Sequence, residues 1–168
     1  MPFTEANFEN AILEIFRDLL GYEYLYGPDV VRDFTEPLCV EILEDALVRI
    51  NPSLPRAAID EAITRIRNIE SGSLVRKNAR FTDMLQNGVA VNYFDGSEQR
   101  AGLVRLVDYD LPMRNRFTVA NQWTVEERSV RRADIVVFVN GLPLVVVELK
   151  SPSREATDVS EAYAQLRN

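Results

Sequence analysis

Histidine is absent from the 168-residue sequence, and cysteine occurs once, at Cys39. Without histidine the chain has no histidine base and no histidine metal ligand, which excludes the serine and cysteine hydrolases of that kind and most zinc enzymes. A single cysteine forms neither an intramolecular disulfide nor a cysteine-based zinc site, which fits a reducing cytoplasm. Carboxylates, lysine, tyrosine and hard cations remain for catalysis.

Long apolar segments are missing as well. The longest apolar run, Leu142 to Val147, is far too short to cross a bilayer, and residues 1–10 show no signal-like stretch. We therefore expect a soluble, untargeted, cytoplasmic protein with no membrane partner. A composition of 46% hydrophobic and 27% charged residues is typical of one globular domain, and we expect a single domain over residues 1–168.

The net charge of −7 disfavours a surface that binds nucleic acid everywhere, yet the charges are unevenly distributed. Residues 1–61 hold 13 acidic and 4 basic residues, whereas residues 62–132 hold 8 acidic and 12 basic residues. This distribution permits a basic strip in the second segment, although ordinary solvated arginines explain it equally well. The candidate DNA contacts near this strip are Arg114, Arg116, Arg131 and Arg132.

Amphipathic patterns predict three helices in the first half of the chain. They are expected at residues 8–20, 38–50 and 55–69. Thr4 and Asn7 are cap candidates for the first helix, which should end at Gly21. The stretch 21–37 is rich in turn residues, so we expect no regular element there.

β-Branched and aromatic runs after Gly88 predict five strands separated by turn residues. They are expected at residues 89–94, 102–107, 117–125, 135–139 and 142–149. Residues 158–167 return to a helical composition. Together these elements predict a mixed α/β layer architecture.

Charged residues are embedded in the otherwise apolar segment 131–150, RRADIVVFVNGLPLVVVELK, which reads as two buried strands joined at the Asn-Gly pair. A buried charge is costly unless it is paired or bound to a metal, so Asp134, Glu148 and Lys150 need a reason to lie there. Residues two apart in a strand share a face, so Glu148 and Lys150 project together beside Asp134. The pattern indicates a metal site with an adjacent cation. From spacing alone, a salt bridge at the strand ends is the alternative.

The residue types in this segment suit phosphodiester hydrolysis. Asp134 and Glu148 would hold Mg²⁺ through few protein ligands and leave places for water and phosphate oxygens. The ion would polarise the phosphate and lower the pKa of a water, while Lys150 would orient that water or stabilise charge on phosphorus. No nucleophilic side chain is required.

The hairpin loop decides whether the two carboxylates can meet. A regular two-residue loop at the Asn-Gly pair would put Asp134 and Glu148 on opposite faces of the sheet, where they could not share one ion. The loop must therefore have an odd number of residues, or the strands must carry a bulge. We prefer a three-residue loop at 139–141 with Gly141 left-handed, and a loop at 140–142 is the alternative.

The string DIVVFVNGLPLVVVELKSP, residues 134–152, resembles the nuclease motif of the R (restriction) subunits of type I restriction-modification enzymes, in the PD-(D/E)xK superfamily. Both the Asn-Gly-Leu-Pro turn and the Glu-Leu-Lys-Ser-Pro ending match, which is more specific than the bare triad. The string Leu-Gly-Tyr at residues 20–22 resembles the start of that domain, so the similarity spans nearly the full chain. The resemblance implies a restriction-endonuclease-like α/β fold, with a mixed sheet flanked by helices and catalytic roles for Asp134, Glu148 and Lys150.

Two further residues are implied only by the resemblance. In that family a glutamate on the first helix approaches the metal; we choose Glu9 as this ligand, and Glu14 is the competitor, while a solvated helix face would explain either. A Gln-x-x-x-Tyr motif follows the lysine, and Gln165 fits its first position as a catalytic residue. The tyrosine would fall directly after Asn168. We therefore expect an N-terminal fragment of a larger motor subunit that, alone, cuts DNA weakly or not at all.

The resemblance also implies cofactors and partners. They are Mg²⁺, duplex DNA, methyltransferase and specificity subunits, and ATP bound by a helicase-like translocase. This sequence contains no Gly-x-x-x-x-Gly-Lys-Ser/Thr phosphate loop, so ATP binding would belong to another part of the full-length subunit. The expected function is magnesium-dependent endonuclease cleavage of duplex DNA. The alternatives are another PD-(D/E)xK repair or recombination nuclease, and a catalytically idle DNA-docking or subunit-docking module.

Overall fold

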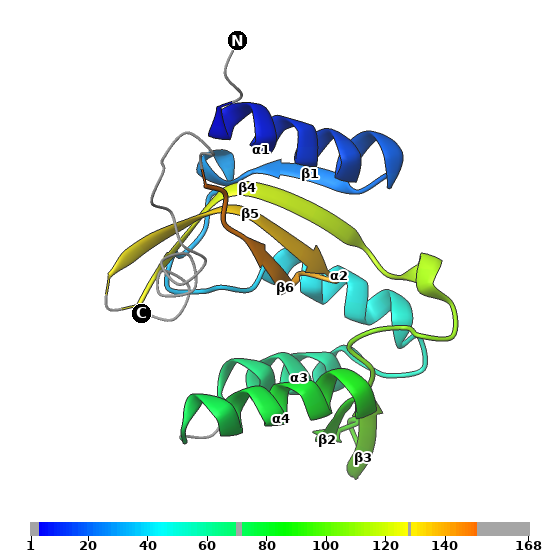
Figure 1. Cartoon of the computed structure of the whole chain (residues 1–168). Helices are drawn as coiled ribbons and strands as arrows, with labels where there is room; N and C mark the ends of the chain where they lie inside the picture. The colour runs from blue at the N-terminus through cyan, green and yellow to red at the C-terminus, as the bar shows by residue number, and fades with distance from the viewer. Residues whose placement is uncertain (1–3, 70–71, 128, 151–168) are drawn as a thin grey trace. The chain divides into compact units, whose positions relative to one another are not determined.

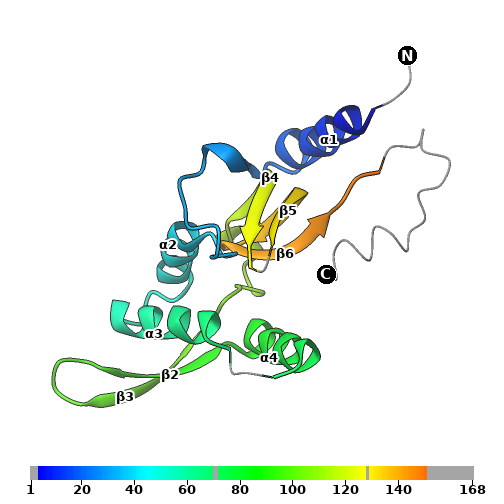
Figure 2. The same ribbon diagram turned by 90° about the vertical axis from the view of Figure 1, so that its left-hand side faces the viewer.

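The computed structural model describes residues 4–69, 72–127 and 129–150 (Figures 1 and 2). The chain divides into two compact units. Unit 1 comprises residues 1–37, 117–138 and 143–168, and unit 2 comprises residues 38–116 and 139–142. Helices and strands occur in both units, which confirms the predicted mixed α/β fold class. The single domain expected from composition stays a prediction.

The first helix of unit 1 is α1, Glu5–Glu14, which continues as a π-helical segment, Ile15–Leu19. A capping box starts α1: the Asn7 amide donates to Thr4 Oγ1 at 3.3 Å, and the Thr4 amide donates to Asn7 Oδ1 at 3.0 Å. After the helix, Gly21 has a φ of 70°, a left-handed conformation that favours glycine. The predicted helix, its cap and its end are confirmed.

A four-stranded mixed sheet with the order β1-β4-β5-β6 forms the centre of unit 1. The strands are β1 (Glu23–Tyr26), β4 (Phe117–Glu126), β5 (Val130–Val139) and β6 (Leu142–Val147). β1 runs parallel to β4, with Glu23 level with Thr118. β1 was not predicted, because three of its four residues are exposed and show no apolar alternation.

The two faces of this sheet pack against different side chains. On one face Leu13 of α1 lies in a cluster with Val119 and Ile135, and Figure 1 shows α1 lying along the sheet. Phe138 stands three residues beyond Ile135 in β5, so its side chain points to the other face. There its ring meets that of Trp123 edge to face, with centroids 4.9 Å apart.

Unit 2 packs three helices with a two-stranded antiparallel hairpin. Its elements are α2 (Val40–Ile50), α3 (Arg56–Arg67), α4 (Leu74–Asn87), β2 (Val89–Phe94) and β3 (Gln99–Val104). Figure 2 shows α3 and α4 over the same side of the hairpin, and the core includes Leu47, Ile63 and Val91. α4 was not predicted, because its first turns are basic and polar and none of its residues is buried.

The predicted strand ends shift where polar residues lie inside strands. β3 begins at Gln99, three residues before the predicted start, and β5 begins at Val130, five residues early. Pairing within the sheet extends both strands through exposed polar residues that a hydrophobic pattern omits. β6 ends at Val147, so Glu148 and Leu149 follow the strand instead of belonging to it.

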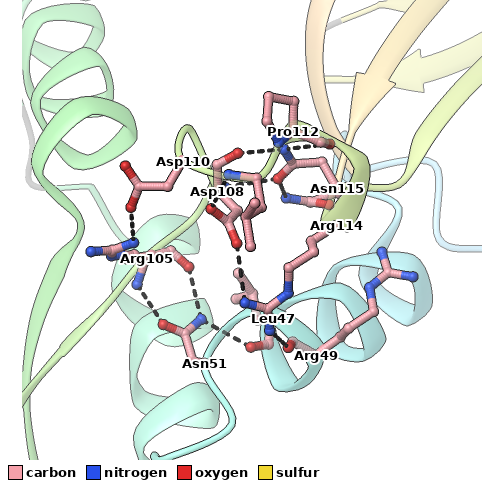
Figure 3. Close-up of polar contacts among 11 residues, drawn as sticks. Leu47, Arg49, Asn51, Arg105, Asp108, Asp110, Pro112, Arg114 and Asn115 are labelled. Atoms are coloured by element: carbon pink, nitrogen blue, oxygen red, sulfur yellow. Dashed lines mark hydrogen bonds and ion pairs between the residues drawn. The ribbon is translucent and has the colours of Figure 1, made fainter.

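A polar network holds the loop after β3 in unit 2 (Figure 3). The Asp108 amide donates to Asn115 Oδ1 at 2.8 Å, and Asn115 Nδ2 donates to the Asp108 carbonyl oxygen at 2.8 Å. Arg114 Nη1 lies 3.3 Å from the Asp108 carboxylate. Asn51 makes hydrogen bonds of 2.9 Å with both the amide and the carbonyl oxygen of Arg105. Side chains thus supply the hydrogen bonds that this irregular backbone cannot make with itself.

Candidate active site

The β5–β6 hairpin carries the predicted catalytic residues. Asp134 lies half-buried in β5, and Glu148 and Lys150 follow the end of β6. Asp134 Oδ2 accepts a hydrogen bond of 2.7 Å from the Leu149 amide. Lys150 Nζ lies 3.6 Å from Glu148 Oε1, and these side chains are 29% and 19% exposed. The fold therefore ties the aspartate to the short segment that bears the glutamate and the lysine.

Packing places Asp134 on the face of the sheet that points away from α1. Ile135 lies in the cluster against α1, so its neighbour Asp134 projects to the opposite face. Val147, the last residue of β6, packs against the same cluster, and Glu148 follows it outside the strand. That the two carboxylates share one metal ion stays a prediction.

The hairpin loop corrects the prediction of a three-residue loop at 139–141. β5 and β6 are separated only by Asn140 and Gly141. Their φ values of 52° and 79° are both left-handed, the combination of a type I′ turn. A regular ladder from this turn would put Val147 on the face of Asp134, whereas Val147 packs against α1. A bulge in these strands, the second of the two possibilities that the sequence left open, stays a prediction.

The buried side chain of Asn140 explains the two-residue turn. This residue is fully buried in unit 2. Asn140 Nδ2 donates to Asn115 Oδ1 at 2.9 Å, and the Arg116 amide donates to Asn140 Oδ1 at 2.7 Å. Gly141 is equally constrained, because a Cβ there would lie 2.5 Å from the Cys39 carbonyl oxygen. Packing and hydrogen bonds of the Asn-Gly pair thus fix the two-residue turn. The predicted three-residue loop was chosen because it is common in hairpins, and that choice took no account of these contacts.

The donor set at the hairpin fits Mg²⁺. This ion prefers hard oxygen ligands and keeps several waters, so two carboxylates are an adequate protein contribution. Asp134 and Glu148 are the residues that could hold it. Within residues 4–69, 72–127 and 129–150, no three acidic or cysteine side chains form a metal-binding group. A metal-ligand role for Glu9 therefore stays a prediction.

Glu9 of α1 binds two carboxamides of β4. Its Oε1 accepts from Asn121 Nδ2 at 2.7 Å, and Gln122 Nε2 lies 3.1 and 3.2 Å from its two carboxylate oxygens. The Tyr24 hydroxyl donates to Asn121 Oδ1 at 3.0 Å. Burial raises the pKa of Tyr24, and the Glu9 carboxylate raises it further. Glu14, the competing helix glutamate, is exposed.

Sequence reasoning missed Asn121 and Gln122. The signal was available: two adjacent carboxamides interrupt an otherwise apolar run at 117–125. Buried polar groups need hydrogen-bond partners, and Asn121 is only 8% exposed. The same argument that singled out Asp134 would have selected this pair.

The four arginines predicted to contact DNA lie in different environments. Arg114 forms the ion pair with Asp108 at 3.3 Å in unit 2. Arg116 is half-buried, whereas Arg131 and Arg132 are exposed in β5 of unit 1. The exposed pair is the better placed to reach a phosphate, and DNA contact by all four stays a prediction.

Gln165 and the predicted helix at 158–167 lie outside the described residues. Their roles stay predictions. In the part of the chain that the structure describes, no helix combines the length and apolar character needed to cross a membrane.

Comparison with known proteins bears on nearly the whole chain. Residues 2–168 match the family described as "Type I restriction enzyme R protein N terminus". The chain is 40% identical to the type I restriction enzyme HindI endonuclease subunit of Haemophilus influenzae, over 96% of this chain and 16% of that protein. It is 31% identical to the putative type I restriction enzyme MjaIXP endonuclease subunit of Methanocaldococcus jannaschii, over 89% of this chain and 15% of that protein. The chain thus spans a small part of the length of these relatives.

Proposed function

Because the chain belongs to the family of type I restriction enzyme R protein N termini, we propose that it is the DNA-cleaving domain of such an endonuclease subunit. The reaction is hydrolysis of a phosphodiester bond in duplex DNA. One observation carries the proposal: the half-buried Asp134 accepts a hydrogen bond from Leu149, the residue between Glu148 and Lys150. This contact ties Asp134 to the segment that bears Glu148 and Lys150, which supports the proposal.

Asp134 and Glu148 would hold Mg²⁺. The ion supplies a positive charge that polarises the scissile phosphate and lowers the pKa of a water. The Leu149 amide orients the Asp134 carboxylate through their 2.7 Å hydrogen bond. Because a backbone amide is fixed by the chain, the carboxylate is set before any ion or substrate arrives.

Lys150 supplies the cation beside the acids. Its Nζ lies 3.6 Å from Glu148 Oε1, close enough for the carboxylate to hold the amine near the reacting phosphate. An ammonium group has three donors, which suit a phosphate oxygen or the attacking water. Lys150 thus orients the water and offsets negative charge on phosphorus.

DNA would reach this site along the sheet of unit 1. Arg131 and Arg132 are exposed at the start of β5, the strand that carries Asp134. Contacts with phosphate oxygens carry no sequence information, so we expect cutting by this domain to have no sequence preference of its own. Recognition would fall to a specificity subunit, and modification to a methyltransferase subunit.

ATP use would reside elsewhere in the full-length subunit. The chain spans 16% of the HindI endonuclease subunit, and its 168 residues contain no Gly-x-x-x-x-Gly-Lys-Ser/Thr loop. A net charge of −7 gives these residues little nonspecific affinity for phosphate. The chain alone therefore cleaves DNA weakly or not at all.

The test uses the restriction complex that contains this chain. Asp134→Asn, Glu148→Gln and Lys150→Ala should each lower plasmid cleavage by on the order of 10²-fold or more, the loss typical when a key charge-stabilising group is removed. ATP hydrolysis should continue, because another domain performs it. Glu126→Gln, at an exposed residue of the same sheet, is the matched control and should cleave normally. Wild-type cleavage by Asp134→Asn would contradict the proposed function.

A further inference from the structure

Asn121 and Gln122 are adjacent in β4, yet both side chains reach Glu9 on α1. Adjacent residues of a regular strand point to opposite faces of the sheet. Here Asn121 Nδ2 donates to Glu9 at 2.7 Å, and Gln122 Nε2 donates at 3.1 Å. The backbone must therefore depart from regular strand geometry between them.

The departure is at Gln122, whose φ is 53°. A left-handed residue inside a strand is typical of a β-bulge, which redirects side chains and often lies next to an active site. The packing on either side of it agrees. Val119 lies in the cluster against α1, whereas Trp123, four residues on, meets Phe138 on the opposite face. The alternation of β4 has shifted by one residue across Gln122.

The bulge lies beside the catalytic aspartate. β4 ends at Glu126 and β5 begins at Val130, and the two strands are neighbours in the sheet. Gln122 lies four residues before the end of β4, and Asp134 lies four residues after the start of β5. Counting from these strand ends, we infer that the two residues lie near the same level of the sheet.

Two contacts hold the bulge in place. On the side chain, the Glu9 carboxylate accepts from Gln122 and Asn121, and Asn121 is itself fixed by the Tyr24 hydroxyl at 3.0 Å. On the backbone, Gly27 packs so closely that a Cβ there would lie 2.5 Å from the Gln122 carbonyl oxygen. A conformation that non-glycine residues rarely adopt persists because its surroundings fix it on both sides.

We propose that Glu9 is a positioning residue: its carboxylate holds the Gln122 bulge, and the bulge sets the position of Asp134 on the adjacent strand. The inference rests on the proposed function. It assigns Glu9 a role through Asn121 and Gln122, where the family resemblance implied direct binding of the metal. It also makes the conformation of one β4 residue a requirement for catalysis.

Two pairs of variants test the proposal. One pair changes the Glu9 carboxylate, and the other changes the backbone preference of residue 122. Glu9→Gln keeps an oxygen that accepts from Asn121, whereas Glu9→Ala removes it. Gln122→Gly keeps the left-handed backbone at no steric cost, whereas Gln122→Val opposes it. In the restriction complex, Glu9→Gln and Gln122→Gly should keep most of the cleavage rate. Glu9→Ala and Gln122→Val should lose on the order of 10²-fold, the effect of misplacing a catalytic group by about 1 Å.

Two readouts do not depend on cleavage. The first is hydrogen exchange of the Leu149 amide, which donates to Asp134 at 2.7 Å. Exchange should quicken in Glu9→Ala and Gln122→Val and stay at the wild-type rate in the conservative partners. The second is Mn²⁺ binding by calorimetry, which Glu9→Gln should preserve and Asp134→Asn should abolish. Melting curves of all variants serve to check that each variant is folded.

The outcomes separate this inference from the proposed function. Loss of Mn²⁺ binding in Glu9→Gln would identify Glu9 as a ligand and overturn the inference. Wild-type Leu149 exchange in a folded Gln122→Val variant would overturn it as well, because the bulge would then not control Asp134. Normal cleavage by Asp134→Asn would contradict the proposed function instead, and the Leu149 measurement would still decide the positioning role.

Discussion

The two units treat their buried polar groups differently. In unit 2, the carboxamides of Asn140 and Asn115 bond to each other at 2.9 Å and to the backbone around them. In unit 1, the buried Thr118 hydroxyl and the Trp123 indole N–H have no hydrogen-bond partner within the described residues. Among the residues that the structure describes, each unit contains one left-handed residue other than glycine, Asn140 in unit 2 and Gln122 in unit 1. Unit 2 thus uses polar residues to fix its fold, whereas unit 1 retains unsatisfied polar groups in β4, the strand next to β5.

Such a difference is expected where one region carries chemistry. Unsatisfied buried groups and unusual backbone angles cost free energy, and they persist at sites where function needs that geometry. The hairpin that bears Asp134 extends from unit 1 to a turn that belongs to unit 2. We therefore expect substitutions in the unit 2 network to act mainly on stability, and substitutions around Gln122 and Asp134 to act mainly on cleavage.

The largest stability loss should follow from Asn140→Ala. This change removes the acceptor for the Arg116 amide, in a partly buried contact, and the donor to Asn115, in a buried one. Each buried group left unpaired costs about 1–3 kcal/mol, so unfolding by urea should show a loss of about 3 kcal/mol or more. Asn78→Ala, at an exposed residue of α4, is the control and should change little. Equal stability of both variants would remove the contrast between the units.

Smaller effects are expected from substitutions of arginine. Arg114 should contribute mainly to stability, whereas the exposed arginines of β5 should contribute mainly to DNA binding. Arg114→Ala breaks the ion pair with Asp108, whose side chain is only 5% exposed, so it should lower stability by about 1 kcal/mol and lower DNA affinity less than loss of the exposed pair does. Replacing Arg131 and Arg132 together by alanine should change stability little and weaken DNA binding. It should reduce the slope of log affinity against log salt concentration by about 2, because each phosphate contact contributes about 0.9. Unfolding by urea measures the stability, and fluorescence anisotropy with labelled duplex DNA measures the affinity. A normal slope in the double variant would contradict the assignment.

The smallest effect should appear in the β2–β3 hairpin of unit 2. The backbone amides of Glu98 and Ser97, followed by the Ser97 hydroxyl and Arg100, lower the pKa of Asp95. Because the pKa of this carboxyl is lower in the folded state than in the unfolded state, its ionised form stabilises the fold. This stabilisation is present at pH 7 and declines as the pH falls below about 4. Asp95→Asn should therefore lower the melting temperature slightly at pH 7, by an amount that shrinks on acidification. A constant difference across this range would show that the charge is not responsible.

The sequence predicted the parts of the site that depend on composition and alternation. Asp134, Glu148 and Lys150 are recognisable because charges in an apolar strand are rare, and the N-terminal helix because its cap and its ending glycine are local signals. The turn at Asn140 could not be predicted, since its length is fixed by hydrogen bonds to residues distant in the sequence, among them Arg116. The bulge at Gln122 depends likewise on Glu9, 113 positions away.

The proposed reaction requires that Asp134 and Glu148 together hold the catalytic ion. A crystal of the chain grown with Mn²⁺ and measured at the manganese absorption edge tests it most directly, because anomalous scattering locates the ion without assumptions about activity. We expect one ion between these two carboxylates, with oxygen distances of about 2.0–2.3 Å and no bond to Glu9, and we expect Asp134→Asn to abolish the peak. Absence of manganese from this position in the wild-type crystal, or an ion bound by Glu9, would contradict it.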